Sequence, residues 1–149
     1  MARLGIDHAL SRKERKRRRP DSDRDLALIV SGDEGITRMV SIYFGAAGFA
    51  TIFAETGLEA VKTWKTVEPD VVIIDVGAPH LTGLEFCKWI RMEKGDLKTP
   101  VIAIAAPVDS ESGEKILRAG ANAFLTRPVE MTHLLNIVKR ELRTEPGRR

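Results

Sequence analysis

Val71-Val-Ile-Ile-Asp-Val-Gly-Ala-Pro-His-Leu-Thr-Gly83 is the stretch that decides the fold of this chain of 149 residues. Its first four residues are all apolar, which is typical of a strand buried on both faces, and they end at the carboxylate of Asp75. A loop follows, and Thr82-Gly-Leu-Glu85 is a capping box that predicts the start of a helix. A buried strand, a loop and a helix in that order form the repeating unit of a parallel α/β sheet.

The same alternation extends from this stretch toward both ends of the chain. The predicted strands are Leu26–Val30, Phe49–Ala54, Val71–Ile74, Pro100–Ala105 and Ala123–Thr126. The predicted helices span about 36–47, 56–67, 82–93, 110–119 and 131–142. Five strands alternating with five helices predict an α/β fold of (βα)5 type, with a doubly wound, five-stranded parallel sheet. In such folds, functional groups collect beyond the carboxyl ends of the strands.

The net charge of +3 combines two unlike parts. Residues 1–20 hold eight basic and two acidic side chains, whereas residues 21–142 hold 13 basic and 18 acidic ones. We therefore expect a basic, mobile N-terminal arm over 1–25, a domain over 26–142 and a disordered C-terminal tail over 143–149. Since only seven residues follow the last predicted helix, we expect no attached output domain.

Composition excludes several classes of protein. The single cysteine, Cys87, is incompatible with a disulfide framework or a four-thiolate zinc site, and its spacing in the helix predicts core packing. No apolar run approaches the ~20 residues of a membrane helix, and the charged N-terminus is unlike a signal peptide, so we expect a cytoplasmic protein. Without a glycine-rich phosphate loop, GxSxG or HExxH, we expect no enzyme of another class.

Three motifs in order make about four-fifths of the chain resemble the receiver domain of two-component response regulators. They are Asp75 with Pro79 and Gly83, then PVIAIAA at 100–106, then GANAFLTRP at 120–128. The resemblance implies a flavodoxin-like fold and a role in bacterial signalling. It also implies that Asp75 takes a phosphoryl group from a histidine kinase.

That chemistry requires a divalent cation and a fixed donor group. The resemblance implies that Mg²⁺ is held by an acidic pair after the first strand, the aspartate and a backbone carbonyl, and that a hydroxyl after the fourth strand and a lysine after the fifth hold the phosphoryl oxygens. In a gapless alignment, Ser31 and Gly32 occupy the positions of the acidic pair, and a one-residue slip would bring in Asp33 instead. The carbonyl position falls on Gly77 and the hydroxyl position on Ala105. Arg127 replaces the lysine, followed by Pro128, and in the family the peptide bond between these two positions is typically cis.

The pocket is therefore predicted to be degenerate. With few anionic ligands besides Asp75, we expect no cofactor, or only weak Mg²⁺ binding through Asp33 and Asp75. The planar fork of Arg127 favours a bidentate pair with Asp75, which would fill the space of a phosphoryl group. A working phosphoacceptor remains the alternative for Asp75, and Asp33 and Glu34 are either metal ligands or charges favoured at a helix N-terminus.

Other residues are candidates for contacts with partners. Phe124 occupies the place of an aromatic that, in receivers, swings inward on activation. Together with Leu117 it could lie on the face made by the fourth and fifth helices. The alternative for Phe124 is that it fills the core. Trp89 lies outside the 84/87/90 core stripe, so we expect an exposed interface anchor or a side chain that covers a loop. The arm can bind nucleic acid, anionic lipid or an acidic partner, or be a solvated tail; its clustered cations are Arg12, Lys13, Arg15, Lys16, Arg17, Arg18 and Arg19.

Three functions follow as hypotheses. The first is a stand-alone, atypical receiver that signals by protein–protein interaction, with a histidine kinase or a downstream effector as partner, or as a homodimer. The second is a conventional single-domain response regulator phosphorylated on Asp75 in a phosphorelay. The third is a nucleic-acid or membrane-surface adaptor that uses residues 12–19 as a polyanion contact.

Overall fold

The computed structural model describes residues 24–76, 82–105 and 110–143. Its strands are β1 (Leu26–Val30), β2 (Ala50–Ala54), β3 (Val71–Asp75), β4 (Val101–Ala105) and β5 (Ala123–Thr126). Its helices are α2 (Glu34–Ala46), α3 (Gly57–Thr66), α4 (Thr82–Lys88), η1 (Trp89–Glu93), α5 (Ser110–Arg118) and α6 (Met131–Arg143). The predicted alternation of strands and helices is confirmed, with boundaries that differ by one or two residues.

The five strands form one parallel sheet in the order β2-β1-β3-β4-β5. The chain therefore reverses its direction of progress across the sheet between β1 and β3, the strand order of flavodoxin-like folds. In the register of this pair, Val30 lies opposite Ile74. The residues that follow β1 thus lie beside Asp75, the last residue of β3, and beyond the carboxyl ends of both strands.

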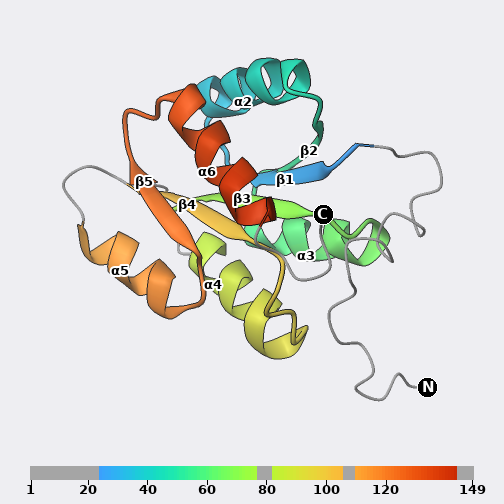
Figure 1. Cartoon of the computed structure of the whole chain (residues 1–149). Coiled ribbons are helices and arrows are strands. Elements are labelled where there is room, and N and C mark those ends of the chain that lie inside the picture. Colours follow the sequence, from blue (N-terminus) through green and yellow to red (C-terminus); the bar gives the residue numbers. More distant parts are fainter. Residues whose placement is uncertain (1–23, 77–81, 106–109, 144–149) are drawn as a thin grey trace.

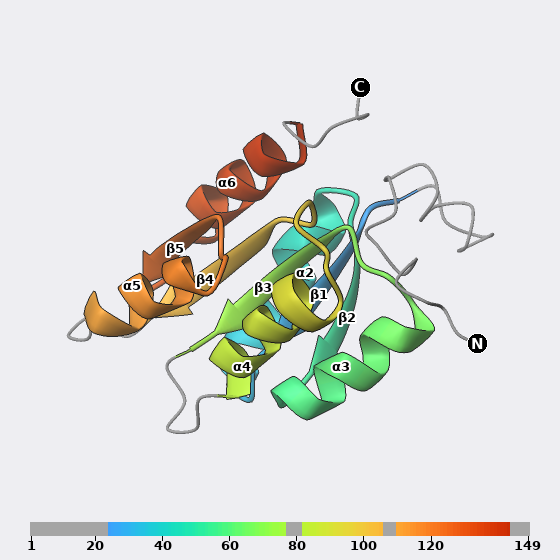
Figure 2. The same ribbon diagram turned by 90° about the horizontal axis from the view of Figure 1, so that it is seen from below.

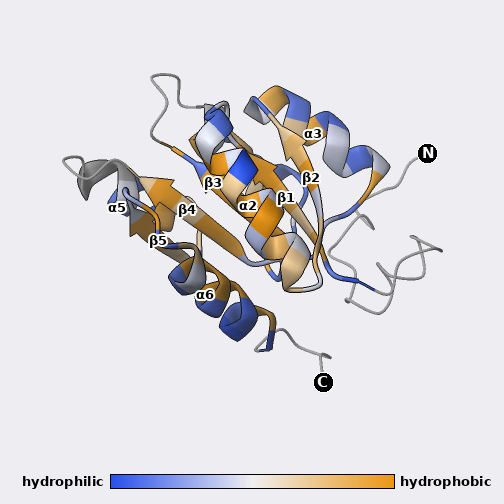
Figure 3. Ribbon diagram, turned by 90° about the horizontal axis from the view of Figure 1, so that it is seen from above, coloured by the Kyte–Doolittle hydropathy of each residue, from blue (hydrophilic) through white to orange (hydrophobic). Residues whose placement is uncertain are grey.

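Helices cover both faces of the sheet, with α2 and α6 on one face and α3, α4 and α5 on the other (Figures 1 and 2). Alternate residues of each strand point to opposite faces. Ala27 and Ile29 pack with α2 and α6, whereas Leu28 and Val30 pack with the other three helices. Figure 3 shows the strands as mainly hydrophobic and the outer side of α6 as hydrophilic. The central strands are buried on both faces, as their apolar runs predict.

The capping box at the start of α3 is present. The hydroxyl of Thr56 accepts from the N–H of Glu59 at 3.2 Å. In return, Glu59 Oε1 accepts from the N–H of Glu55 at 2.9 Å, one residue before the cap. The N–H of Glu59 in the first helical turn thereby gains a partner, and the Glu59 side chain ties the residue before the cap to the helix.

The helix predicted over about 82–93 ends in a π-helical turn, and its Trp89 is half-buried, not exposed. The Trp89 ring stacks on Phe86, with centroids 5.9 Å apart, and meets Trp64 of α3 edge-on at 6.1 Å. The expected exposure of Trp89 is therefore wrong, because a neighbouring helix supplies an aromatic surface for its ring. Its role as an interface anchor stays a prediction. Cys87 is fully buried, as predicted.

Candidate functional site

The carboxylate of Asp75 lies at the carboxyl end of β3, and its side chain is only 5% exposed. One of its oxygens, Oδ2, accepts two hydrogen bonds. Ser31 Oγ donates to it at 2.9 Å from the loop after β1, and Arg127 Nη2 donates to it at 2.5 Å from the end of β5. Three strand ends thus converge on one carboxylate, as the sheet topology predicts.

Arg127 is fixed by both its backbone and its side chain. Its N–H donates to the carbonyl of Ala105 at 3.0 Å, and its bond to Pro128 is cis, as the resemblance implied. The two ends of the guanidinium fork go to different carboxylates, since Nη1 donates to Asp33 Oδ2 at 2.9 Å. The predicted contact with Asp75 is present, but the predicted bidentate pairing is wrong: Asp33 lies close enough to accept from the second nitrogen.

Asp33 joins the site from the first residue before α2. Its Oδ1 caps the helix by accepting from the N–H groups of Gly35 and Ile36, at 2.9 and 3.3 Å. Its own N–H donates to Ser31 Oγ at 3.0 Å. The hydrogen bonds from Arg127 and from the Ile36 N–H hold the pKa of Asp33 below its usual value. Asp33 is thus a helix cap, as one alternative predicted, and also a partner of Arg127.

Two carboxylates, those of Asp75 and Asp33, share one cation, the guanidinium of Arg127. Partial burial lowers the pKa of Arg127, but the hydrogen bonds from its guanidinium to Asp75 and Asp33 outweigh that effect, and the pKa is raised. Arg127 therefore stays protonated at any ordinary pH. Because the Asp75 side chain is 5% exposed, removal of Arg127 would leave a buried carboxylate without its cation, which is costlier than breaking an exposed pair, whereas removal of Asp75 would leave Arg127 paired with Asp33.

The positions that the family fills with the acidic pair for the metal, and with the hydroxyl for the phosphoryl group, hold other groups here. Ser31 is a hydrogen-bond donor to Asp75, Gly32 is exposed without a side chain, and Ala105 is buried without a hydroxyl. Gly77 lies outside the described residues. In residues 24–76, 82–105 and 110–143 no three His, Cys, Asp or Glu side chains are grouped to hold a metal. Among these residues, the carboxylates of Asp75 and Asp33 both accept hydrogen bonds from the guanidinium of Arg127.

Phe124 points toward α5, where its ring fills the space beside Gly113. A Cβ on Gly113 would lie 2.6 Å from two carbons of that ring, so only glycine fits there with the ring in this place. Phe124 is half-buried against the core cluster beneath α3, α4 and α5. Leu117, on the same helix as Gly113, is exposed. The arm residues 12–19 lie outside the described residues.

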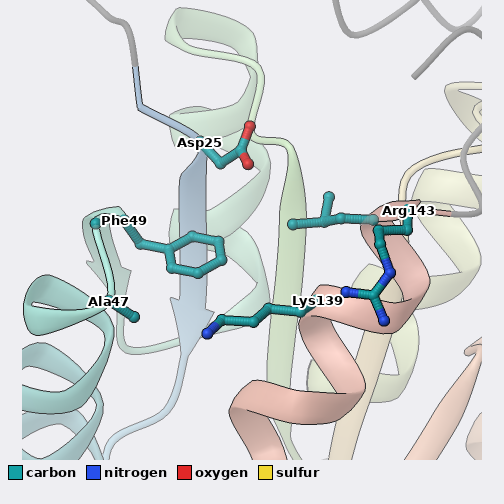
Figure 4. A pocket seen from close by; sticks show the side chains of 7 residues that line it. Asp25, Ala47, Phe49, Lys139 and Arg143 are labelled. Atoms are coloured by element: carbon teal, nitrogen blue, oxygen red, sulfur yellow. The ribbon is translucent and has the colours of Figure 1, made fainter. Parts of the chain in front are cut away.

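Two features of the molecule were not singled out from sequence. One is the hydrogen bond from Ser31 to Asp75, for which the Ser-Gly-Asp sequence directly after β1 is the available signal. The other is a cavity of about 220 Å³ at the opposite end of the sheet, lined by Asp25, Phe49, Lys139 and Arg143 (Figure 4). Its two cations are on the last turns of α6, where positive charge is favoured by the helix dipole.

Comparison with known proteins relates this chain to response regulators. The sequence profile of the response regulator receiver domain matches residues 27–139. The regulatory protein AtoC of Escherichia coli is 32% identical over 118 residues, which are 79% of this chain but only 25% of AtoC. The polar-differentiation response regulator DivK of Brucella ovis is 28% identical over 112 residues, 75% of this chain and 91% of DivK.

A solved structure has the same fold. A putative response regulator from Chloroflexus aurantiacus superposes with a TM-score of 0.75 at 29% identity, over 80% of this chain and 98% of that one. In the part of the chain that the structure describes, no helix has the length and apolar character to cross a membrane.

Proposed function

Since the chain belongs to the response regulator receiver domain family, we propose that it acts in signal transduction by binding protein partners, with Asp75 held in an ion pair instead of serving as a Mg²⁺-dependent phosphoacceptor. One observation carries this proposal: the guanidinium of Arg127 bridges Asp75 and Asp33. The family membership supports signalling, and the bridge supports a site that works without phosphorylation.

The bridge places a permanent cation, the guanidinium of Arg127, beside Asp75. In the family's chemistry, an exchangeable Mg²⁺ ion lies beside this carboxylate. Transfer of a phosphoryl group to Asp75 requires a divalent cation and a donor that hold the developing charge on the phosphoryl oxygens. Arg127 already donates to Asp75 Oδ2, and Ala105 offers no hydroxyl to a phosphoryl oxygen. A guanidinium at this carboxylate supplies a positive contact without an incoming group, so the site needs no phosphoryl transfer to be satisfied.

The inward place of Phe124 supports a site that stays in one state. In receivers the equivalent aromatic moves inward on activation, and here the ring rests against Gly113 of α5. Phe124 is on the short strand β5 and Arg127 directly follows that strand, so a fixed Arg127 also restrains the backbone that carries the ring. We therefore propose that partners recognise this one arrangement.

Titration calorimetry with Mg²⁺ and beryllofluoride, a phosphoryl analogue, tests the proposal. We expect the full chain to show no beryllofluoride binding at millimolar Mg²⁺, because the bridge excludes both ions. The matched variant restores the family pattern through Ser31→Asp, Gly32→Asp, Ala105→Thr and Arg127→Lys. We expect this variant to bind beryllofluoride, since it regains an acidic pair, a hydroxyl and a lysine.

Beryllofluoride binding by the unmodified chain, lost in Asp75→Ala, would contradict the proposal. It would favour the conventional response regulator, in which Asp33 leaves Arg127 and completes a metal site with Asp75. Circular dichroism of each variant confirms that a lack of binding is not a lack of folding.

A further inference from the structure

A groove of about 660 Å³ lies between η1 and the turn that follows α5, away from the Asp75 site. Two large apolar side chains border it, Met92 at 77% exposure and Leu97 at 76%. Exposed apolar residues beside a hollow are a common mark of an interaction site. Methionine adds a flexible, polarisable side chain that adapts to the shape of a partner.

The floor of this groove is rigid because Arg91 ties three segments together. Its Nε donates to the carbonyl of Gly120 at 3.0 Å, Nη1 to the carbonyl of Asp96 at 2.8 Å and Nη2 to Asn122 Oδ1 at 3.1 Å. Gly120 has φ +118°, and a Cβ there would lie 2.5 Å from Arg91 Cγ, so the backbone rests directly on the arginine. A surface fixed in this way loses little conformational freedom when a partner binds.

The charge of the groove is opposite to that of the domain. Among the described residues that line it, the charged ones are Lys88, Arg91 and Arg118, and all are basic, whereas residues 21–142 together are acidic. Arg118 contacts Glu114 at 3.5 Å, but both side chains are largely exposed, and such a pair exchanges readily for another partner. The potential in the groove therefore favours an anionic partner.

The apolar rim decides which kind of anion fits. A nucleic-acid backbone or another phosphate-rich polymer gains contacts from Lys88 and Arg118, but none from Met92 or Leu97. A protein segment that presents a bulky apolar side chain between acidic residues matches both features at once. The apolar side chain enters the hollow beside Met92 and Leu97, and the carboxylates meet the basic rim.

We infer that this groove docks an acidic segment of a partner protein through one apolar anchor residue. The inference rests on the protein-interaction role proposed above and gives that role a surface and a class of partner. It does not depend on the state of Asp75, because the groove lies near the amino ends of β4 and β5, opposite to the strand ends that hold Asp75 and Arg127.

Selection of short random peptides displayed on phage against the full chain tests this inference. The library is first depleted on the double variant Met92→Glu, Leu97→Glu, which keeps the basic arm and so removes peptides that bind the arm alone. We expect the enriched peptides to carry acidic residues on both sides of a Leu, Ile, Phe or Trp. A synthetic peptide of the enriched sequence should lose at least about tenfold in affinity for the double variant and for Lys88→Glu.

Two controls separate the possible failures. Ile42→Glu alters another exposed apolar side chain, on α2 and thus on the opposite face of the sheet, and should leave the affinity for the peptide unchanged. Addition of Mg²⁺ and beryllofluoride should also leave it unchanged, so the peptide result stands whether or not Asp75 accepts a phosphoryl group. Enriched peptides without acidic residues, or equal affinity for the double variant, would overturn the inference.

Discussion

The guanidinium of Arg127 has two carboxylate neighbours, and each restricts what the other can do. A lysine at this position offers a single point charge, whereas the planar fork of arginine reaches two acceptors at once. Asp33 is held on its other oxygen by the N-terminus of α2, so it stays in place for Arg127. The bridge therefore joins the cap of α2 at Asp33, the end of β3 at Asp75 and the residue after β5, Arg127. The order of the strands in the sheet brings these three residues together.

The pH dependence of stability tests the Asp33–Arg127 contact. The folded protein lowers the pKa of Asp33 from 3.8, so this group contributes stability above that pH and loses it as the pH falls through the lower, folded value. Asp33→Asn keeps a good helix cap but removes the charge. We expect urea unfolding to show a stability difference between wild type and variant at pH 6 that shrinks by pH 3.

Glu34→Gln provides the matched comparison, since Glu34 is an acidic residue on the first turn of the same helix. It should change stability by less than about 0.5 kcal/mol at either pH. A difference between wild type and Asp33→Asn that is the same at pH 3 and pH 6 would show that the carboxylate charge is not engaged.

The strands were predictable as elements, whereas the π-helical form of the last turn of the helix over 82–93 was not. Continuous apolar runs such as Val71–Ile74 point to doubly buried strands whatever surrounds them. Trp89 is different. Its spacing from Phe86 places both rings on one helix face, but only the position of Trp64 on α3, known from the tertiary structure, explains why that face is covered. The π turn at Trp89–Glu93 likewise has no signal in the sequence.

Gly113→Ala tests the contact between α5 and β5. The added methyl would lie 2.6 Å from the Phe124 ring, so the ring or the helix must move. We expect a net loss of about 1–2 kcal/mol in the free energy of unfolding, despite the better helix propensity of alanine. NMR shifts of the Phe124 ring should change with it.

Gly45→Ala in α2 is the matched control, because nothing lies within 4 Å of a Cβ at that position. It should stabilise the protein by a few tenths to about 1 kcal/mol. If both variants stabilise equally and the Phe124 ring shifts stay the same, the ring does not rest on Gly113.

At the scale of the whole molecule, motif spacing predicted which residues meet but not how they pair. The order of the three motifs predicted that Asp75, Ala105 and Arg127 lie close together. It did not reveal that Asp33 accepts a hydrogen bond from one of the two terminal nitrogens of Arg127. An aspartate directly before a helix is expected as a cap in any case, so its presence there does not also indicate an ion pair. The division of charge between the basic arm and the acidic domain was readable from composition alone.

The arm remains a proposed polyanion contact, and salt dependence tests it. Residues 12–19 contain seven cations, and each phosphate they neutralise releases a counterion. We expect the full chain to bind duplex DNA without sequence preference, with affinity falling roughly a thousandfold between about 50 and about 200 mM salt. Deletion of residues 1–20 should abolish that binding, and binding that survives the deletion would assign it to another surface.

The central claim is that Arg127 keeps Asp75 from accepting a phosphoryl group. The most direct test is to incubate the full chain with Mg²⁺ and a small-molecule phosphoryl donor and then to measure its intact mass. We predict no adduct of about 80 Da on the unmodified chain. The variant that restores Asp at 31 and 32, Thr at 105 and Lys at 127 should show the adduct under the same conditions. A clear adduct on the unmodified chain that is absent from Asp75→Ala would contradict the account.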